Sequence, residues 1–457
     1  MNAVVKLPPP PSAVAPEPAL EALPHGYTHR QIAEALSPLI QELILLPTEK
    51  CNVRCTYCYE DFELGMMSET TQTAIEAFLT ERIPKLKILR LSWFGGEPLV
   101  AKDVVLRIAK HAKTLCDAHG VELTGGLTTN AYVLDKALAK QLMALHQSFY
   151  QITLDGWKEA HDALRKRADG KGTFEVIWQN LLGLRDLTED FEVCVRIHVR
   201  RDNQENLETL MHEYAKAFYN DKRFRLDFQH LRDMGGEGGQ TIINGVTLQE
   251  LPVIEARLRK IVVAEIRSLR GEAPITQEIV PNSAAYANRQ AARAAERIVE
   301  DAADSAVLDT TVVPLPQVAA PLPEPVIQTE NNAQLEEGII VQKAKNAGES
   351  AGSQRSNSEH AGAPYICYAA KANSLLIRSN GRIGKCTVHF DDERNDIGYL
   401  SDAGKIVIAQ DKLRPWLRGL ETLDTDITGC PIHGLPAVEQ RSPFPNGKAF
   451  IAVKQVQ

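Results

Sequence analysis

The sequence predicts an α/β protein built on a parallel sheet. Six short apolar runs alternate with longer amphipathic segments between Gln41 and Leu231. Apolar residues of the longer segments recur at three- and four-residue spacing, which is the period of a helix that covers a sheet. Alternating strands and helices favour parallel pairing, and continuous apolar strands indicate that both faces of the sheet are covered. Periodicity alone leaves two architectures open: a partial barrel, or an open doubly wound sheet.

The strands are predicted from apolar runs, and the helices between them from their periodicity. The strands are predicted at 42–48, 88–94, 121–129, 149–155, 191–199 and 223–230. The helices are predicted at 68–83, 101–119, 134–146, 173–187 and 206–219. A further amphipathic segment at 247–271 is predicted to pack on the same sheet. The chain from 41 to 275 is therefore predicted to be one domain of six βα units.

Composition changes on both sides of this domain. Residues 1–40 begin with a Pro-rich segment that lacks the apolar core of a signal peptide, so we predict a disordered leader on a cytoplasmic protein. Residues 276–362 are dominated by Ala, Pro, Gln, Asn, Ser and Glu and are predicted to be a low-complexity linker or insertion. A second, smaller domain is predicted over 363–457.

Bulk composition argues against several classes of function. The net charge of −8 is unlike that of a nucleic-acid binder, which normally carries a basic excess. No apolar run approaches the roughly 18 residues of a membrane span, so neither nucleic acid nor membrane is an expected partner. Eight cysteines in 457 residues do not make a disulfide framework, and three of them fall within eight residues. That spacing favours metal ligation in a reducing compartment.

The three clustered cysteines directly follow the first predicted strand, in Cys51-Asn-Val-Arg-Cys55-Thr-Tyr-Cys58. Active sites of βα barrels are built at the carboxyl ends of the strands. Three thiolates on a short loop can bind three corners of a cubane cluster and leave one iron open for a small molecule. Zinc is the alternative, but no fourth Cys or His lies between residues 59 and 90. We therefore predict a [4Fe–4S] cluster on Cys51, Cys55 and Cys58, with Tyr57 shielding it from water.

The spacing CX3CXφC, in which φ is aromatic, resembles the signature of the radical S-adenosylmethionine superfamily. The resemblance implies a partial (β/α)6 barrel and two cofactors, a [4Fe–4S] cluster and S-adenosylmethionine. Gly95-Gly96-Glu97-Pro98, at the end of the second strand, resembles the GGE(P) motif of that family. Two glycines let the backbone approach a ligand closely, and the Glu97 carboxylate is expected to accept from the methionyl amine of the cofactor.

Polar residues at other strand ends resemble a branch of the family that includes sulfatase-maturing and peptide-modifying enzymes. Thr128-Thr129-Asn130 is similar to its TN stretch, Thr153-Leu154-Asp155-Gly156 to its S/T-L-D-G stretch, and His161-Asp162 with Arg165 to its HDxxR segment. From these positions and from the fifth strand, cofactor contacts are predicted for Thr129, Asn130, Thr153, Asp155, Arg165 and Arg196.

Two alternatives accompany these contacts. Thr129 and Asn130 are equally well explained as caps of the following helix. His198, on the same side of its strand as Arg196, is predicted to be a hydrogen-bonded core histidine.

The C-terminal cysteines Cys367 and Cys386 fit C-X13-G-X4-C, which resembles the start of a SPASM or twitch domain that holds auxiliary iron–sulfur clusters. A hairpin predicted at 375–382 is expected to bring them together. Of the later cysteines of such a domain only Cys430 is present. At the positions of the others the sequence has His433, Glu439 and Pro443.

A degenerate domain is therefore predicted. It either holds one auxiliary cluster on Cys367, Cys386, Cys430 and a fourth ligand, for which His433 is a candidate, or it holds none. The remaining cysteines, Cys116 and Cys194, are predicted to be buried core thiols.

The resemblance implies that an electron entering the Cys51/Cys55/Cys58 cluster cleaves the cofactor into methionine and a 5′-deoxyadenosyl radical, which abstracts hydrogen from an unactivated carbon. We expect a maturase that forms a C–C or thioether cross-link in a ribosomally made precursor peptide. An external electron donor and a separate peptide-recognition protein are the expected partners.

Two other functions are the alternatives. An anaerobic sulfatase maturase is disfavoured, because Thr387 stands where that family has an Asp. A non-catalytic iron–sulfur redox sensor or scaffold is disfavoured by the Gly-Gly-Glu-Pro motif. No side chain is assigned a catalytic role.

Overall fold

The computed structural model describes residues 23–60, 62–231, 244–272 and 364–436. The chain divides into two compact units, of which the first combines 1–283 with 363–457 and the second is 284–362. All described residues belong to the first unit. The predicted linker or insertion at 276–362 lies outside the described residues, as do Glu439 and Pro443.

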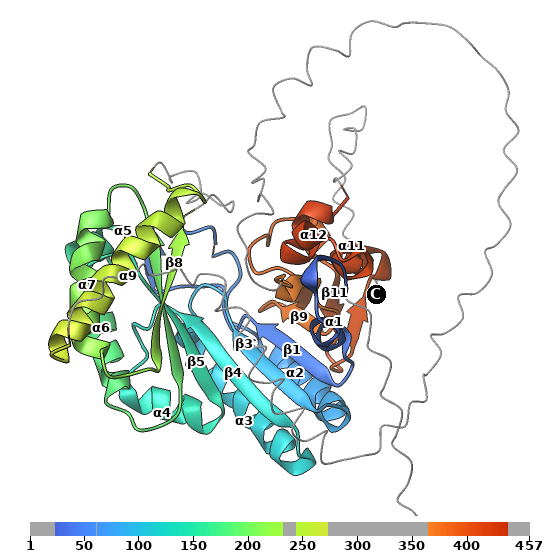
Figure 1. Ribbon diagram of the computed structural model, residues 1–457. Coiled ribbons are helices and arrows are strands. Elements are labelled where there is room, and N and C mark those ends of the chain that lie inside the picture. The colour runs from blue at the N-terminus through green and yellow to red at the C-terminus, as the bar shows by residue number, and fades with distance from the viewer. Residues whose placement is uncertain (1–22, 61, 232–243, 273–363, 437–457) are drawn as a thin grey trace, which may run out of the picture. The chain divides into compact units, whose positions relative to one another are not determined.

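The predicted strands and helices are confirmed, with ends that shift by one to three residues (Figure 1). The strands, in the order in which they lie in the sheet, are β1 (Ile40–Leu45), β3 (Ile88–Trp93), β4 (Glu122–Thr129), β5 (Gln147–Leu154), β7 (Glu192–Val199) and β8 (Phe224–His230). The helices are α2 (Glu69–Arg82), α3 (Lys102–His119), α4 (Lys136–Ala144), α6 (Phe174–Arg185), α7 (Gln204–Phe218) and α9 (Glu250–Leu269). No described helix is long and apolar enough to cross a membrane.

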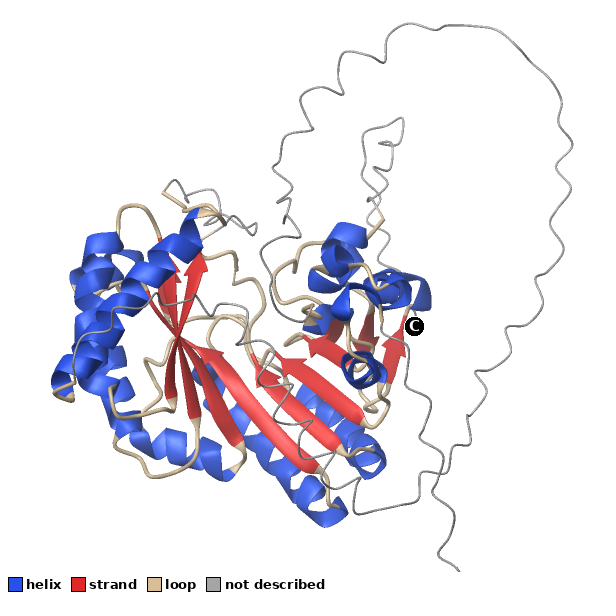
Figure 2. Ribbon diagram, in the orientation of Figure 1, coloured by secondary structure: helices blue, strands red, loops and turns tan. Residues whose placement is uncertain are grey.

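Strand order decides between the two predicted architectures. All five neighbouring pairs from β1 to β8 are parallel, and each new strand is added on the same side of the one before. A doubly wound sheet would reverse its order at a switch point. Because crossovers are right-handed, growth in one direction places the helices on one face, where Figure 2 shows them. The arrangement is that of a partial (β/α)6 barrel.

The core lies between this sheet and its helices. Leu43 of β1 and Leu91 of β3 are fully buried, together with Ile75 of α2 and Ile108 of α3. Burying a side chain of this size stabilises the fold by roughly 1.5–3 kcal/mol. The strand ends that carry the polar motifs therefore belong to a well-packed sheet.

The sheet continues beyond β1 into the C-terminal part of the chain. β9 (Ser374–Ile377) is parallel to β1, and β10 (Arg382–Gly384), β11 (Gly398–Leu400) and β12 (Ile406–Ile408) follow as antiparallel strands. The β9–β10 pair confirms the predicted hairpin. Two helices, α11 (Gln410–Thr422) and α12 (Thr425–Gly429), complete this part. Residues 364–436 are thus joined to the barrel through one continuous sheet.

The prediction of a disordered leader over 1–40 is wrong for residues 23–40. Helix α1 (His29–Leu36) contains no proline and begins at a capping box, in which Thr28 and Gln31 each accept a hydrogen bond from the other's backbone N–H. Tyr27 is 4% exposed, and its hydroxyl is hydrogen-bonded to Thr428. Contacts with residues about 400 positions away order this segment, and composition cannot reveal such contacts.

Candidate functional site

The cysteine loop lies at the carboxyl end of β1, and its three thiols are partly exposed. Val53–Cys55 form a short strand, β2, which pairs antiparallel with β6 (Arg165–Arg167). Strand β6 directly follows the short helix α5 (Glu159–Leu164). The backbone N–H of Thr56 adds a 2.9 Å hydrogen bond to the Leu164 carbonyl. Sequence reasoning missed these strands because three residues are too few to show a period. The ladder fixes the position of Cys55 against the segment that carries Arg165.

Burial and neighbouring charges decide how readily the three thiols form thiolates. Burial raises the pKa of Cys51 to about 12, with Glu97 adding to the effect, and burial with Cys55 raises the pKa of Cys58 to about 12. Burial also raises the pKa of Cys55. Thiols in such surroundings form thiolates when a metal supplies the missing positive charge. Three partly exposed thiols on one fixed loop therefore fit a [4Fe–4S] cluster with one open iron.

Gly95 and Gly96 admit the backbone that leads into the cysteine loop. A Cβ on Gly95 would lie 2.3 Å from the Thr48 carbonyl oxygen, and one on Gly96 would lie 2.7 Å from the Glu49 carbonyl oxygen. Gly95 also has a φ of +106°, which side chains rarely adopt. The predicted close approach is therefore real, but the approaching group is the chain itself and not a ligand. Pro98 follows as the first residue of a buried 3-10 turn (Pro98–Ala101).

The Glu97 carboxylate is 1% exposed and occupied by protein donors. Its Oε1 accepts from the Leu99 N–H (2.9 Å) and the Thr129 hydroxyl (2.7 Å), and its Oε2 accepts from the Asn130 N–H (2.6 Å). Burial raises the pKa of the carboxyl group, and these donors oppose the shift. The carboxylate ties the end of β3 to the end of β4, and its contact with the methionyl amine stays a prediction.

Asn130 contacts the cysteine loop and Thr129 donates to Glu97, and neither residue caps a helix. The cap of α4 is Asp135, whose side chain accepts from the Leu138 N–H, so the capping alternative is wrong. The Asn130 side-chain amide donates to the Asn52 side chain (2.8 Å) and lies 3.8 Å from the Cys51 sulfur. The residue that follows β4, Asn130, is therefore in direct contact with Cys51.

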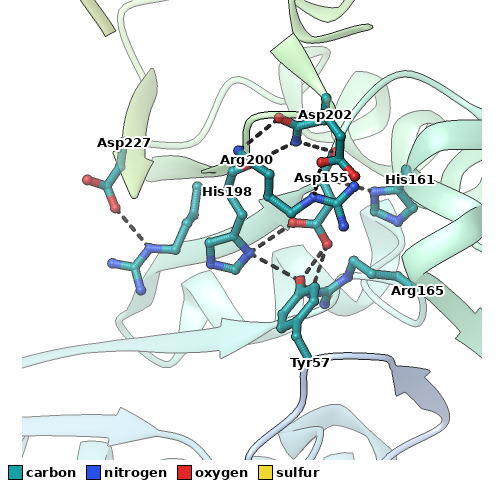
Figure 3. A network of polar contacts seen from close by, with 10 residues as sticks. Tyr57, Asp155, His161, Arg165, His198, Arg200, Asp202 and Asp227 are labelled. Atoms are coloured by element: carbon teal, nitrogen blue, oxygen red, sulfur yellow. Dashed lines mark hydrogen bonds and ion pairs between the residues drawn. The ribbon is translucent and has the colours of Figure 1, made fainter. Parts of the chain in front are cut away.

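Tyr57, between the second and third cysteines, enters a buried polar network (Figure 3). Its hydroxyl donates to the Asp155 carboxylate (2.5 Å) and accepts from Arg165 Nη1 (2.7 Å). His198 Nδ1 lies 2.9 Å from the same carboxylate and 3.1 Å from the Tyr57 hydroxyl. His198 is thus the hydrogen-bonded histidine that was predicted.

Asp155 lies at the centre of this network and is fully buried. Burial alone would raise the pKa of its carboxyl group, but His198 and Arg165 outweigh it and hold the pKa well below its usual range. His161 Nδ1 accepts from the Asp155 backbone N–H (3.3 Å). The carboxylate is surrounded by protein partners, and the cofactor contact of Asp155 stays a prediction.

Cofactor contacts were also predicted for Arg165, Arg196 and Thr153, and these three residues differ in their surroundings. Arg165 Nε is buried and has no hydrogen-bond partner among the described residues, so an acceptor on a ligand would satisfy it. Arg196 pairs in register with Thr153 of β5, and its Nε donates to Asp227 of β8 at 2.9 Å. The Nε of Arg196 is therefore already paired with a carboxylate of the protein. Thr153 is 9% exposed.

Sequence reasoning missed two acidic residues that flank the cysteine loop. Glu49, two residues before Cys51, receives both Nε and Nη2 of Arg378. Glu60, two residues after Cys58, has an Oε2 that is buried without a hydrogen-bond partner in the described part of the chain. Burial, with Glu49 adding to it, raises the pKa of Glu60 to about 8. Only the fold shows that these carboxylates are buried.

Cys386 and Cys430 lie close enough to Cys367 to act on its thiol electrostatically. Burial raises the pKa of Cys367 to about 12, with Cys386 and Cys430 contributing as neighbouring charges. His433, the candidate fourth ligand, is exposed. Across the described ranges, no three His, Cys, Asp or Glu side chains close around the position of a single metal ion. Cys116 and Cys194 are core thiols, 1% and 0% exposed, as predicted.

Two tyrosines are hydrogen-bonded to Thr387, which follows Cys386: Tyr59 from the end of the cysteine loop, and Tyr368 from beside Cys367. The Tyr59 hydroxyl, next to Cys58, donates to the Thr387 carbonyl (3.3 Å). The Tyr368 hydroxyl accepts from the Thr387 N–H (3.0 Å) and is hydrogen-bonded to its Oγ1 (2.8 Å). Thr387 is therefore a structural link between the two sets of cysteines.

Comparisons with known proteins agree with this site. The model of the Radical SAM superfamily matches residues 45–213. Fe-coproporphyrin III synthase of Methanosarcina barkeri is 24% identical over 223 residues, which are 47% of this chain and 50% of that protein. The serine-type anaerobic sulfatase-maturating enzyme of Klebsiella aerogenes is 24% identical over 171 residues, which are 36% of this chain and 42% of that protein.

A solved structure, native anSMEcpe with bound AdoMet and Cp18Cys peptide, aligns at 16% identity with a TM-score of 0.45, over 82% of this chain and 80% of that one. The chain spans about half the length of the curated relatives described above. The segment matched by the family model contains the cysteine loop, the Gly-Gly-Glu-Pro motif and the Tyr57 network. The family uses a [4Fe–4S] cluster and S-adenosylmethionine, and its members among the relatives are enzymes. Residues 45–213 are a radical SAM domain.

Proposed function

We propose that the protein is an enzyme that cleaves S-adenosylmethionine reductively at a [4Fe–4S] cluster held by Cys51, Cys55 and Cys58. The observation that carries this proposal is the set of three partly exposed thiols, fixed on one loop at the carboxyl end of β1 within the matched domain. When bound, the cluster and its cofactor supply a 5′-deoxyadenosyl radical that removes a hydrogen atom from an unactivated carbon.

The chain itself positions this chemistry. Asn130 and the backbone at Gly95 and Gly96 set the start of the loop, and β6 sets its middle. Arg165 Nε and the Asn130 amide are polar groups near the thiols, suited to hold the polar ends of the cofactor. Such contacts give orientation, which is the main contribution of a protein to cofactor chemistry.

The substrate that we propose is a side chain of a peptide, cross-linked through a C–C or thioether bond during maturation of a ribosomal precursor. Support comes from a relative that is named for maturing a sulfatase, which is a protein substrate. Further support comes from the C-terminal cysteine segment, which resembles a SPASM or twitch domain and touches the cysteine loop through Tyr59 and Thr387. An external electron donor, a separate peptide-recognition protein and a reducing, cytoplasmic setting complete the proposal.

An auxiliary cluster on Cys367, Cys386 and Cys430 is part of the same proposal. Support for it comes from the electrostatic effect of Cys386 and Cys430 on Cys367. Counting iron after anaerobic reconstitution of a Cys51/Cys55/Cys58→Ala variant tests it. Iron retained by this variant supports a second site, and iron-free protein counts against one. A Cys367/Cys386/Cys430→Ala variant is the matched control, because it should keep the first cluster.

The decisive experiment for the main proposal is anaerobic reconstitution followed by reduction with dithionite in the presence of S-adenosylmethionine. We expect 5′-deoxyadenosine and methionine in equal amounts from the unmodified chain, and neither from Cys51→Ala, Cys55→Ala or Cys58→Ala. Fully reconstituted protein that yields neither product would leave the non-catalytic redox sensor or scaffold as the better explanation.

The second candidate is an anaerobic sulfatase maturase, favoured by the named relative. It predicts that sulfatase-derived peptides with a Cys or Ser target gain a formylglycine and stimulate 5′-deoxyadenosine release. Precursor peptides encoded beside the gene are the competing substrates. The engagement of Thr387 by two tyrosines argues for a structural role of this residue and thus against the second candidate.

A further inference from the structure

The Tyr57 side chain reaches across from the cysteine loop to two strands of the barrel. Its hydroxyl meets Asp155, which directly follows β5, and His198 of β7. Arg165 of β6 donates to the same hydroxyl. One phenol therefore joins the loop to three separate elements, as Figure 3 shows.

These contacts connect Tyr57 to a buried ion pair. Arg165 and Asp155 also approach each other directly, at 3.7 Å, and the Asp155 carboxylate has no exposed surface. Asn203 extends the set by donating to the backbone carbonyls of Asp155 (3.3 Å) and His198 (2.9 Å). Hydrogen bonds to buried charged groups are stronger than those between neutral groups. The hydroxyl of Tyr57 is thus held in one place.

The fixed position of the Tyr57 hydroxyl affects Cys58, because the two residues are neighbours in the motif. Tyr57 is bonded covalently to Cys58, and the Cys58 backbone N–H donates to the Cys55 carbonyl at 3.2 Å. The other two cysteines have anchors of their own, since Asn130 touches Cys51 and the β2–β6 ladder includes Cys55. Cys58 lies between two anchored tyrosines: Tyr57 is bonded to the barrel, and Tyr59 is bonded to the Thr387 carbonyl in the C-terminal part of the chain.

We propose that the Tyr57 hydroxyl is a positioning group for Cys58, and that Asp155, Arg165 and His198 form its receptor. The inference rests on the proposed function, because it assumes that Cys58 binds a cluster. It goes beyond a shielding role for the aromatic ring, because shielding needs the ring and not the hydroxyl. Residues that orient a ligand from behind commonly change metal affinity by about 10- to 100-fold when they are altered.

Tyr57→Phe separates the two roles. The substitution keeps the ring and its edge-on contact with His198, at 5.2 Å between ring centroids, and removes only the hydroxyl. In the full-length, anaerobically reconstituted chain we expect a chelator to extract iron at least about tenfold faster than from the unmodified protein. We also expect the electron paramagnetic resonance signal of the reduced cluster to become heterogeneous, and its change on addition of S-adenosylmethionine to be lost. His198→Gln should give a smaller effect of the same kind.

Tyr132→Phe is the matched control. The Tyr132 hydroxyl accepts from Arg167 Nη1 at 2.9 Å, so this variant also removes a tyrosine–arginine hydrogen bond next to β6, but not on the cysteine loop. A chelator should extract iron from this variant at the same rate as from the unmodified chain, and the electron paramagnetic resonance spectra of the two should match. The proposal is overturned if folded Tyr57→Phe behaves like Tyr132→Phe. Should Tyr57→Phe fail to fold, unchanged iron extraction and spectra in His198→Gln would overturn it.

Iron extraction and spectra do not require turnover. If the unmodified chain binds a cluster but forms no 5′-deoxyadenosine, the proposed function is contradicted. The role of Tyr57 can still be measured in that case. An unmodified chain that assembles no cluster on Cys51, Cys55 and Cys58 would overturn both.

Discussion

Arg378 donates two hydrogen bonds to Glu49, from Nε to Oε1 at 2.9 Å and from Nη2 to Oε2 at 2.7 Å. Glu49 leads into the cysteine loop and is 4% exposed, whereas Arg378 follows β9 in the C-terminal part of the chain. The guanidinium also lies 5.0 Å from the centre of the Phe390 ring. A bidentate pair of this kind fixes direction as well as distance. The C-terminal part therefore helps to set the geometry of the loop.

Arg378→Met should lower the free energy of unfolding by about 2–4 kcal/mol, because it leaves the buried Glu49 carboxylate without its partner. Arg378→Lys should recover only part of this loss, since an ammonium cannot replace the planar fork. Urea unfolding measures both. Arg414→Met is the control: its partner is Glu421, the two side chains are 81% and 54% exposed, and the expected loss is about 0–1 kcal/mol. Equal losses in the two methionine variants would contradict the assigned role.

Gly96→Ala should displace the backbone that leads into the cysteine loop. The new methyl group would meet the carbonyl oxygen of Glu49 and backbone atoms of Lys50 at 2.7 Å, and backbone cannot rotate away as a side chain can. We expect a loss of stability of about 2–4 kcal/mol and substoichiometric iron after reconstitution. Gly65→Ala, where nothing lies within 4 Å of the new Cβ, should bind iron normally. Full iron content in Gly96→Ala would show that the loop tolerates the displacement.

Glu97→Gln tests whether the carboxylate is structural. An amide presents a donor in place of one oxygen, so at least one of the Leu99, Thr129 and Asn130 donors would face another donor. Unfolding experiments should show a loss of about 2–4 kcal/mol. Glu69→Gln, at a side chain that is 83% exposed, should change stability little. Unchanged stability together with lost S-adenosylmethionine binding in equilibrium dialysis would instead support the direct contact with the methionyl amine.

Most of the barrel could be predicted from the sequence, because its strands and helices are long enough to show a period. β5 and β7 each carry eight residues, and their apolar content marks them clearly. β2 and β6 have only three residues each and no such signal. The order of the strands, which separates a barrel from a doubly wound sheet, is a property of tertiary packing and was open until the structure gave it.

In the candidate site, too, local sequence patterns revealed some features and not others. Local spacing identified the cysteine loop, the Gly-Gly-Glu-Pro motif and the strand-end residues. Spacing could not show what each side chain contacts. Glu97 and Asp155 were predicted to face the cofactor, yet the fold buries both carboxylates and surrounds them with protein donors. The pairing of Glu49 with Arg378 joins positions 329 residues apart, which no local pattern encodes.

His161 should make the stability of the barrel depend on pH. It is fully buried behind Asp155, and burial, with Arg165 adding to it, lowers the pKa of its imidazole to about 4. Between this value and the ordinary value near 6.5, the unfolded chain binds a proton that the folded chain does not. The free energy of unfolding therefore falls as the pH falls from about 7 to about 4, by roughly 3 kcal/mol in full. Above pH 7 this contribution is constant.

His161→Gln removes the titrating group, so its stability relative to the unmodified chain should improve on acidification. At pH 7.5 the variant is the less stable, because it loses the bonds of His161 to the Asp155 N–H and the Thr173 hydroxyl. At pH 5.5 the difference should shrink by about 1 kcal/mol. Urea unfolding of both chains at the two pH values measures this change. A difference for His161→Gln that stays constant or grows on acidification would mean that the buried imidazole is protonated in the folded protein.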